Sequence, residues 1–226
     1  MPPRSLRIDL GDGLAVSALL HAPARRHHQK PDIGLVLGHG AGGDMHNPLL
    51  EAVATDLAAR GRAVLRFNFI YKDLGRKAPD PMPKLERAFR GAIGAMRDLR
   101  PRRLVLGGKS MGGRVASLLA AGGEPCDGLV YLGYPLHPAR QPDKMRDQHL
   151  GAIQAPMLFL EGTRDPLCDL DLLRPVLARI GDHASLHIVE GGDHSFDVPK
   201  AAKRSVESVH AEIALAIDGW LGGLAG

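Results

Sequence analysis

The chain has few aromatic side chains, only two cysteines and no long hydrophobic run. Aromatic residues make up 4% of its 226 positions, too few for the stacking platforms on which proteins bind single-stranded nucleic acid. No apolar run approaches the roughly 18 residues needed to span a bilayer. The first residues, MPPRSLRIDLGDG, hold no continuous apolar core followed by small residues, so we expect neither a membrane span nor a secretory signal.

Charge and cysteine content are equally modest. Lys and Arg number 29 against 25 Asp and Glu, a net charge of +4 that is spread along the chain. This excess predicts no nucleic-acid partner, and the densest polar stretch, residues 24–30, is typical of a solvated loop. Cys126 and Cys168 match no metal-ligand spacing and need not pair, which favours two free thiols in a reducing cytoplasm.

Short apolar runs alternate with amphipathic segments along the chain. Two runs around Gly11-Asp12-Gly13 predict an antiparallel β-hairpin. Further apolar runs predict buried strands at residues 33–40, 62–69, 103–107, 128–133, 156–162 and 184–192. Helical periodicity lies between and after them, at residues 49–57, 83–99, 111–121, 169–180 and 206–220. Within the fourth of these helices we expect Pro175 to restart the helix rather than to lie inside it.

This alternation predicts a single α/β domain over residues 1–226. Its central sheet should be mostly parallel and covered by helices on both faces, with the hairpin added at the start. In such sheets, ligands meet the loops that follow the carboxyl ends of the strands. The residues that carry the chemistry are therefore expected in those loops.

The tripeptide Gly108-Lys109-Ser110 lies between a predicted strand and a predicted helix, and it allows two interpretations. A phosphate-binding loop of the form GxxxxGK[ST] requires a glycine five residues before Gly108, where Arg103 stands instead. Residues 104–106 are also an apolar strand, in the place where such a loop would wrap the phosphates. With the next two residues, however, the tripeptide matches the G-x-S-x-G nucleophile elbow, whose glycines avoid collisions in a tight strand-to-helix turn. This pattern favours Ser110 as a nucleophile.

A serine hydroxyl needs a base, and the base needs an orienting acid. Asp165 follows one predicted strand and His194 follows the next, so both should lie at the sheet edge where Ser110 is expected. The chain order serine, aspartate, histidine is the usual one for this elbow. Other candidates fit less well: Asp169 and Asp171 resemble a helix start, His187 lies within a strand and His183 precedes that strand.

Attack of a serine on a carbonyl creates a negatively charged oxygen, which two backbone N–H groups must stabilise. One is expected from Met111, directly after the nucleophile. The other is expected from Ala41, in the glycine-rich loop after the strand that begins at Ile33. Gly40 allows this loop to approach the substrate carbonyl closely.

The segments LGHGAGGDM, GGKSMGGR, GTRDPL and GGDHSF occur in this order. On these motifs the chain resembles the α/β-hydrolase superfamily over essentially its whole length, and it is most similar to the small, lidless hydrolases related to dienelactone hydrolase. The resemblance implies a triad of Ser110, Asp165 and His194, with Ala41 and Met111 as oxyanion donors. Dienelactone hydrolase itself uses a cysteine where this chain has Ser110, so its particular substrate is not carried over.

Members of this superfamily commonly carry a cap domain after the strand that is residues 128–133 here. Only residues 134–153 are available at that place, so the resemblance implies an open site, covered at most by a short strip. We expect three residues to tie this strip down, namely His137, Arg146 and His149. The residues expected to contact substrate are Gly40, Arg66, Asn68 and Tyr71, although Arg66 can instead hold a loop in place.

These observations predict a cytoplasmic serine hydrolase that cleaves esters or related acyl compounds of a small-molecule substrate through an acyl-enzyme intermediate. A peptidase or thioesterase that uses the same triad remains an alternative, and so does a non-catalytic interaction module with this fold. His39, His46 and His194 have no carboxylate at helical spacing, so we predict no metal, and the reaction needs no cofactor. The sequence does not predict the oligomeric state.

Overall fold

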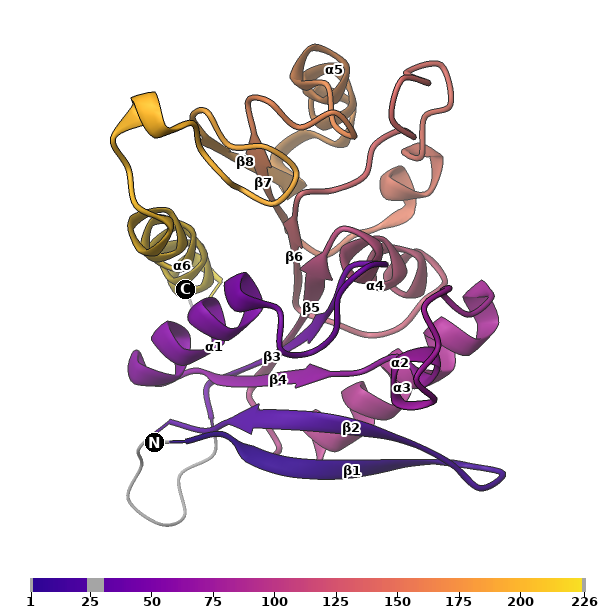
Figure 1. The fold of residues 1–226 in the computed structure, drawn as a ribbon. Coiled ribbons are helices and arrows are strands. Elements are labelled where there is room, and N and C mark those ends of the chain that lie inside the picture. Colours follow the sequence, from indigo (N-terminus) through magenta and orange to yellow (C-terminus); the bar gives the residue numbers. More distant parts are fainter. Residues whose placement is uncertain (1, 24–30, 225–226) are drawn as a thin grey trace.

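The computed structural model describes residues 2–23 and 31–224 (Figure 1). The solvated loop predicted at residues 24–30 lies outside the described residues. Within them, eight strands form one sheet in the order β1-β2-β4-β3-β5-β6-β7-β8. The strands are β1 (Arg4–Gly11), β2 (Leu14–His21), β3 (Ile33–Gly38), β4 (Ala63–Phe67), β5 (Arg103–Lys109), β6 (Gly128–Leu132), β7 (Met157–Gly162) and β8 (Ala184–Val189).

The sheet is mostly parallel, as the alternation of elements predicts. Strands β4, β3, β5, β6, β7 and β8 run parallel to one another. β1 and β2 form the predicted antiparallel hairpin, and β2 pairs antiparallel with β4. Gly11 and Gly13 turn the hairpin with φ of 78° and 69°, a region that favours glycine.

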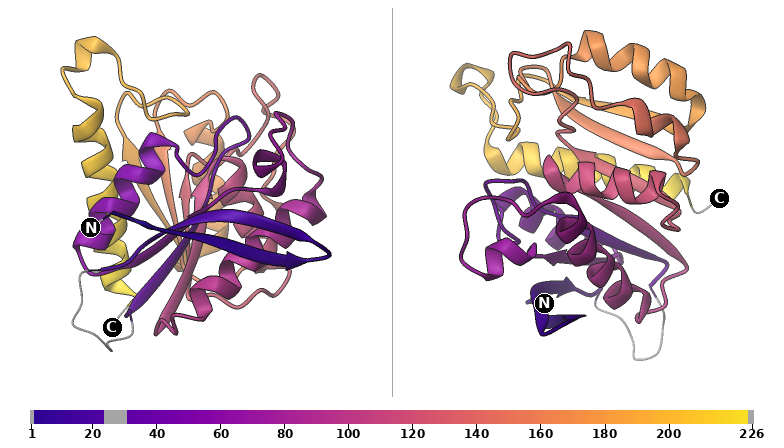
Figure 2. Two further views of the ribbon diagram at one scale, coloured as in Figure 1. Left: turned by 60° about the horizontal axis from the view of Figure 1, so that its bottom comes forward. Right: turned by 90° about the vertical axis from the view of Figure 1, so that its right-hand side faces the viewer.

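Helices cover both faces of this sheet (Figures 1 and 2). One face carries α1 (Pro48–Ala59) and α6 (Val206–Gly223), which pack against each other. The opposite face carries α3 (Met82–Arg97), α4 (Met111–Ala121) and α5 (Leu170–Ile180). A short helix, α2 (Ile70–Asp73), follows β4.

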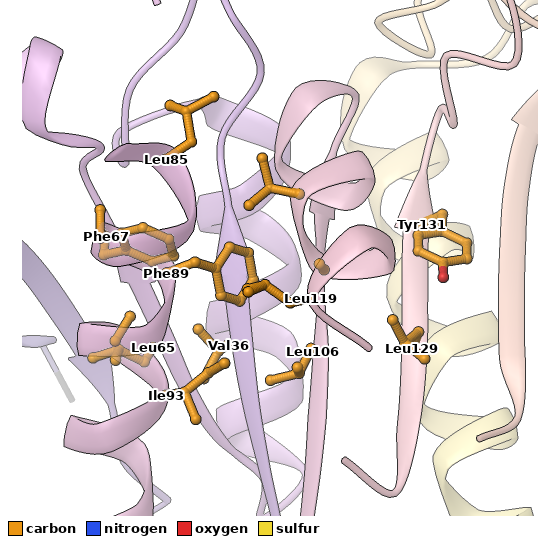
Figure 3. Packing of buried hydrophobic residues seen from close by; sticks show 14 of the residues in the cluster. Val36, Leu65, Phe67, Leu85, Phe89, Ile93, Leu106, Leu119, Leu129 and Tyr131 are labelled. Carbon is orange, nitrogen blue, oxygen red and sulfur yellow. The ribbon is translucent and has the colours of Figure 1, made fainter. Parts of the chain in front are cut away.

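Each helical layer encloses its own hydrophobic core. In the core beneath α3 and α4, Phe89 and Leu119 from the helices meet Phe67, Leu106 and Tyr131 from the strands (Figure 3). The other core is built from α1, α6 and the side chains on the opposite face of the strands. Between the two cores, the parallel pairing of the strands puts the carboxyl ends of β3, β5, β7 and β8 at the same edge of the sheet.

Pro175 lies inside α5, which contradicts the prediction that it restarts the helix. A proline interrupts one backbone hydrogen bond and crowds the carbonyl four residues earlier, here that of Asp171. Both residues are exposed, so water can satisfy the freed carbonyl and the helix continues.

Residues 134–153, between β6 and β7, hold no cap domain. We call this segment the strip. Its one regular element is the 3₁₀ turn Gln148–Ala152. Two of the three expected residues fasten it to its surroundings: His149 Nε2 lies 2.7 Å from Ser117 Oγ of α4, and His137 Nε2 accepts from the Asp169 N–H at 3.2 Å. Arg146 takes part only through its backbone carbonyl, which accepts from the Tyr134 hydroxyl within the strip at 2.7 Å.

Candidate functional site

Ser110 occupies a sharp turn between β5 and α4. Its backbone has φ of 50° and ψ of −114°, a strained conformation for a residue with a side chain. The end of β3 presses against this turn from below. A Cβ atom on Gly108 or on Gly112 would lie only 2.2 Å from the Gly38 carbonyl oxygen, so both positions require glycine. The turn is therefore held by close backbone contact rather than by side chains.

The structure brings Ser110, His194 and Asp165 into one hydrogen-bonded chain. His194 Nε2 lies 2.9 Å from Ser110 Oγ, and His194 Nδ1 lies 2.6 Å from Asp165 Oδ2. An ionised carboxylate only accepts hydrogen bonds, so Nδ1 carries the ring proton and Nε2 is free to accept from the serine hydroxyl. The Asp165 side chain is fully buried, whereas that of His194 remains 21% exposed. The serine–histidine pair is thus open to a ligand from solvent.

Asp165 is fixed by its own loop, directly after β7. Its Oδ1 accepts a hydrogen bond from the Leu167 N–H at 2.7 Å, which leaves Oδ2 for His194. The His194 loop after β8 is braced in the same way, because Asp193 Oδ1 accepts from the N–H groups of Ser195 and Asp197. Both loops therefore hold their side chains in place through local backbone contacts.

Lys109 holds the His194 loop in place, a contact that no pattern in the sequence predicts. Its Nζ donates to the His194 carbonyl oxygen at 3.0 Å, and the side chain is buried. Burial lowers the pKa of this amine, while the nearby carboxylates of Asp165 and Asp193 oppose that effect. The pattern suggested a role for Lys109 only in a phosphate loop, and nothing in the sequence shows which carbonyl it reaches.

A second unforeseen residue is Glu161, near the end of β7. It is fully buried, and one of its oxygens accepts the Tyr134 N–H at 2.6 Å. Burial raises the pKa of Glu161 well above its ordinary value, and the charge of Asp165 adds to the effect. Burial thus favours the neutral form of Glu161, and its contact with Tyr134 fixes the start of the strip.

The glycine-rich loop after β3 runs beside the nucleophile. A Cβ atom on Gly40 would lie 3.5 Å from that of Ser110, so the loop passes directly beside the nucleophile. The neighbouring Ala41 is exposed. Met111 is the first residue of α4, so its N–H has no acceptor within the helix. The two expected oxyanion donors thus belong to segments that meet at Ser110.

His39 holds this loop in shape. The ring is fully buried, and burial lowers its pKa to about 4, so it is neutral near pH 7. Its Nε2 accepts the Phe69 N–H at 3.2 Å, which leaves Nδ1–H to donate to the Gly40 carbonyl at 2.8 Å. The histidine therefore links the loop to the segment after β4.

Three expected substrate contacts turn out to hold this loop instead. Arg66 is fully buried and donates to the Met45 carbonyl and to His21. Asn68 accepts the Met45 N–H at 2.8 Å and donates to Asp73 at 2.8 Å. Tyr71 is also fully buried, and its hydroxyl donates to the Ala41 carbonyl at 2.8 Å. The prediction that Arg66 and Tyr71 contact substrate is wrong because both face the underside of the loop, and the amide group of Asn68 is already occupied.

The remaining candidates have structural contacts of their own. Asp169 caps α5 by accepting the Asp171 N–H at 2.9 Å, as predicted. His187 lies within β8, as predicted, and its Nε2 is 2.9 Å from Glu212 of α6. Cys126 and Cys168 are both free, and burial raises the pKa of each thiol.

Residues 2–23 and 31–224 hold no group of three or more His, Cys, Asp or Glu side chains placed to bind a metal ion. Over the same residues, every helix is too short or too polar to cross a membrane.

Comparison with known proteins identifies the family and the fold. A family model described as an alpha/beta hydrolase domain matches residues 31–222. A dienelactone hydrolase structure from Anabaena variabilis is 21% identical, and the match covers 99% of each chain with a TM-score of 0.74. A lidless serine hydrolase from Xanthomonas campestris is 21% identical over 97% of this chain and 95% of its own, with a TM-score of 0.73. Est1E from Butyrivibrio proteoclasticus is 16% identical over 97% and 98%, also with a TM-score of 0.73.

At these identities the solved structures show the fold, which is that of lidless, dienelactone-hydrolase-like proteins. The family match covers most of the chain and is independent of them. The protein therefore belongs to the α/β-hydrolase family.

Proposed function

We propose that the protein is a serine hydrolase that cleaves esters or related acyl compounds of small molecules. The observation that carries this proposal is the continuous contact from Ser110 Oγ through the His194 ring to Asp165, with distances of 2.9 and 2.6 Å. The serine lies at a strained turn, and a buried carboxylate holds the histidine that contacts it. A protein that serves only as a scaffold has no need for this arrangement.

In the proposed first half-reaction, Ser110 Oγ attacks the acyl carbon while His194 Nε2 takes the hydroxyl proton. Asp165 keeps the imidazole in its tautomer and stabilises the charge that forms on it. The carbonyl oxygen becomes an oxyanion, which the N–H groups of Ala41 and Met111 stabilise. The tetrahedral intermediate then expels the alcohol, which takes the proton from His194 and leaves an acyl group on Ser110.

In the second half-reaction, water replaces the alcohol. His194 Nε2 takes a proton from the water as its oxygen attacks the acyl carbon, and the same two amides hold the new oxyanion. Collapse of this intermediate releases the carboxylic acid and returns the proton to Ser110. Atoms balance with water as the only second reactant, so no cofactor takes part.

Labelling with a fluorophosphonate tests the nucleophile directly. We expect one adduct on the wild-type protein by intact mass, and none on Ser110→Ala or His194→Ala. Ser195→Ala is the matched control, because this exposed serine neighbours His194 but its hydroxyl makes no hydrogen bond with the His194 ring in the described structure. Ester, thioester and amide substrates then separate the acyl classes, and loss of Ser110 should lower turnover by several orders of magnitude. Absence of an adduct on folded wild-type protein would contradict the proposal.

A further inference from the structure

Two arginines beside the nucleophile lack an acidic partner, and this inference rests on the proposed function. Arg114 lies one turn into α4, where its N–H donates to the Ser110 carbonyl at 3.0 Å. Ser110 is the residue directly before α4, so Arg114 follows the nucleophile by one helical turn. Helical side chains also lean toward the N-terminal end, which here is the end at Ser110.

The second arginine, Arg146, comes from the strip. The strip is fastened to α4 by the contact between His149 and Ser117, and the Tyr134 hydroxyl donates to the Arg146 carbonyl. Arg114 is close enough to act electrostatically on this segment. After burial, its charge is the main factor that lowers the pKa of both Arg146 and His149. The strip therefore brings a second cation beside the first.

Nothing in the described residues neutralises this pair. Neither arginine makes an ion pair there, and both are half-buried. Asp147, the nearest candidate in sequence, instead binds Arg179 at 2.6 Å. The Nε of Arg114 is completely buried and has no hydrogen-bond acceptor among the described residues. An unpaired buried donor on a charged group is unfavourable, and a protein normally supplies an acceptor for it.

Among the described residues, an acidic side chain lies within 4 Å of most other arginines: Arg7, Arg60, Arg62, Arg66, Arg76, Arg87, Arg90, Arg97, Arg102, Arg179 and Arg204. Of the described arginines without such a partner, Arg4, Arg100, Arg140, Arg164 and Arg174 are exposed, and Arg103 lies at the opposite end of β5 from Ser110. Arg114 and Arg146 thus form a local positive site at the edge where the proposed reaction takes place.

We propose that Arg114 and Arg146 bind an oxyanion, a carboxylate or a phosphate, carried by the acyl substrate. A guanidinium presents paired N–H donors that match the two oxygens of either group. Because Arg114 is one helical turn from Ser110, the anion lies only a few bonds from the acyl carbon that the serine attacks. The substrate class is therefore short esters or thioesters that carry a negative charge, such as half-esters of four-carbon dicarboxylic acids.

Calorimetry on the Ser110→Ala protein tests binding without turnover. The probes are monomethyl succinate, inorganic phosphate and methyl butyrate, a neutral compound of similar size. We expect at least one anionic probe to bind more tightly than methyl butyrate, and the tighter of the two anions identifies the group. Adding Arg114→Gln or Arg146→Gln should weaken that binding about tenfold, the usual effect of losing a hydrogen bond to a charged group.

Arg140→Gln is the matched control, since it removes an exposed arginine from the same strip. Its affinity should equal that of the parent. Arg114→Lys keeps the charge but loses the paired N–H donors, so this variant should bind the anionic probe more weakly than the parent protein. It also keeps the proposal testable if the glutamine variants fold poorly. Equal affinity for all three probes, or equal affinity in every arginine variant, overturns the proposal.

Turnover separates this inference from the proposed function. With Ser110 intact, the ratio of kcat/KM for a p-nitrophenyl hemisuccinate to that for p-nitrophenyl butyrate should fall about tenfold in Arg114→Gln, and Arg140→Gln should keep the wild-type ratio. If the fluorophosphonate labels Ser110 but the ratio does not change, the anion site is wrong and the hydrolase stands. If Ser110 is not labelled but the anion binds through both arginines, the hydrolase is wrong and the anion site stands.

Discussion

Ser110 is held in a backbone conformation that residues with side chains avoid. Its φ of 50° and ψ of −114° belong to a region that glycine enters easily and other residues enter at a cost of about 1–3 kcal/mol. Contacts of the turn with Gly38 keep this conformation in place. The strained turn directs Oγ toward His194. The free energy of unfolding is therefore lowered at the residue that we propose as the nucleophile.

Replacing Ser110 should therefore reveal the strain. We expect Ser110→Gly to have a higher free energy of unfolding than Ser110→Ala by about 1 kcal/mol, because only glycine adopts this φ without a Cβ penalty. Urea denaturation at pH 7 measures both variants under the same conditions. Equal stability, or a more stable alanine variant, would show that the turn is relaxed.

Lys109 offers a test of positioning rather than of chemistry. Lys109→Met removes the hydrogen bond to the His194 carbonyl while keeping an apolar stem of similar length. We expect kcat to fall about tenfold with little change in KM, because a looser His194 loop affects proton transfer more than substrate binding. Lys109→Arg should restore part of kcat, since it can still donate to that carbonyl. A change confined to KM would assign Lys109 to substrate binding.

The sequence could predict which residues meet at the site, but not which way their neighbours face. Ser110, Asp165 and His194 each follow a strand, and the ends of parallel strands share one edge, so their proximity follows from the pattern. Arg66 and Tyr71 also lie at that edge or just beyond it. Whether such a side chain faces the nucleophile or the underside of a loop depends on packing between segments far apart in the chain. No local sequence pattern encodes that packing.

At the scale of elements, periodicity predicted most boundaries well. The helix predicted at residues 111–121 is α4 (Met111–Ala121), and the strand predicted at 128–133 is β6 (Gly128–Leu132). The errors have physical causes. Pro175 stays within α5 because the carbonyl it frees is solvated, and α2 was not predicted because four residues are too few to show a helical period.

Contact between elements makes one glycine of α4 indispensable. A Cβ on Gly112 would lie 2.2 Å from the Gly38 carbonyl oxygen, so Gly112→Ala should push α4 away from β3 and lower the free energy of unfolding by about 1–3 kcal/mol. Gly219→Ala in α6 is the matched control, because nothing lies within 4 Å of the added methyl group. It should raise stability by about 0.5–1 kcal/mol through helix propensity. Similar effects at both sites in thermal or urea unfolding would contradict this packing.

At the scale of the whole molecule, two buried histidines link stability to pH. His39 directly follows β3 and braces the glycine-rich loop, while His21 ends β2 and accepts a hydrogen bond from Arg66. Burial is the main cause that lowers the pKa of each from 6.5 to about 4, and for His21 the charge of Arg66 adds to it. Both rings are thus neutral in the folded protein at pH values where the unfolded chain is already protonated.

The free energy of unfolding should consequently fall as the pH drops from 6.5 toward 4. The stability from neutral His39 and His21 is fully present above pH 6.5. Below it, the unfolded chain binds a proton at each ring that the folded protein does not, so each histidine removes up to about 1.4 kcal/mol per pH unit. Urea denaturation at steps of half a pH unit measures how steeply the free energy of unfolding changes with pH. In His39→Gln this slope should fall by the contribution of one proton, about 1.4 kcal/mol per pH unit. His183 is exposed, and His183→Gln is the control variant, which should keep the wild-type slope. If His39→Gln also keeps the wild-type slope, the His39 ring accepts its proton in the folded protein and the prediction is wrong.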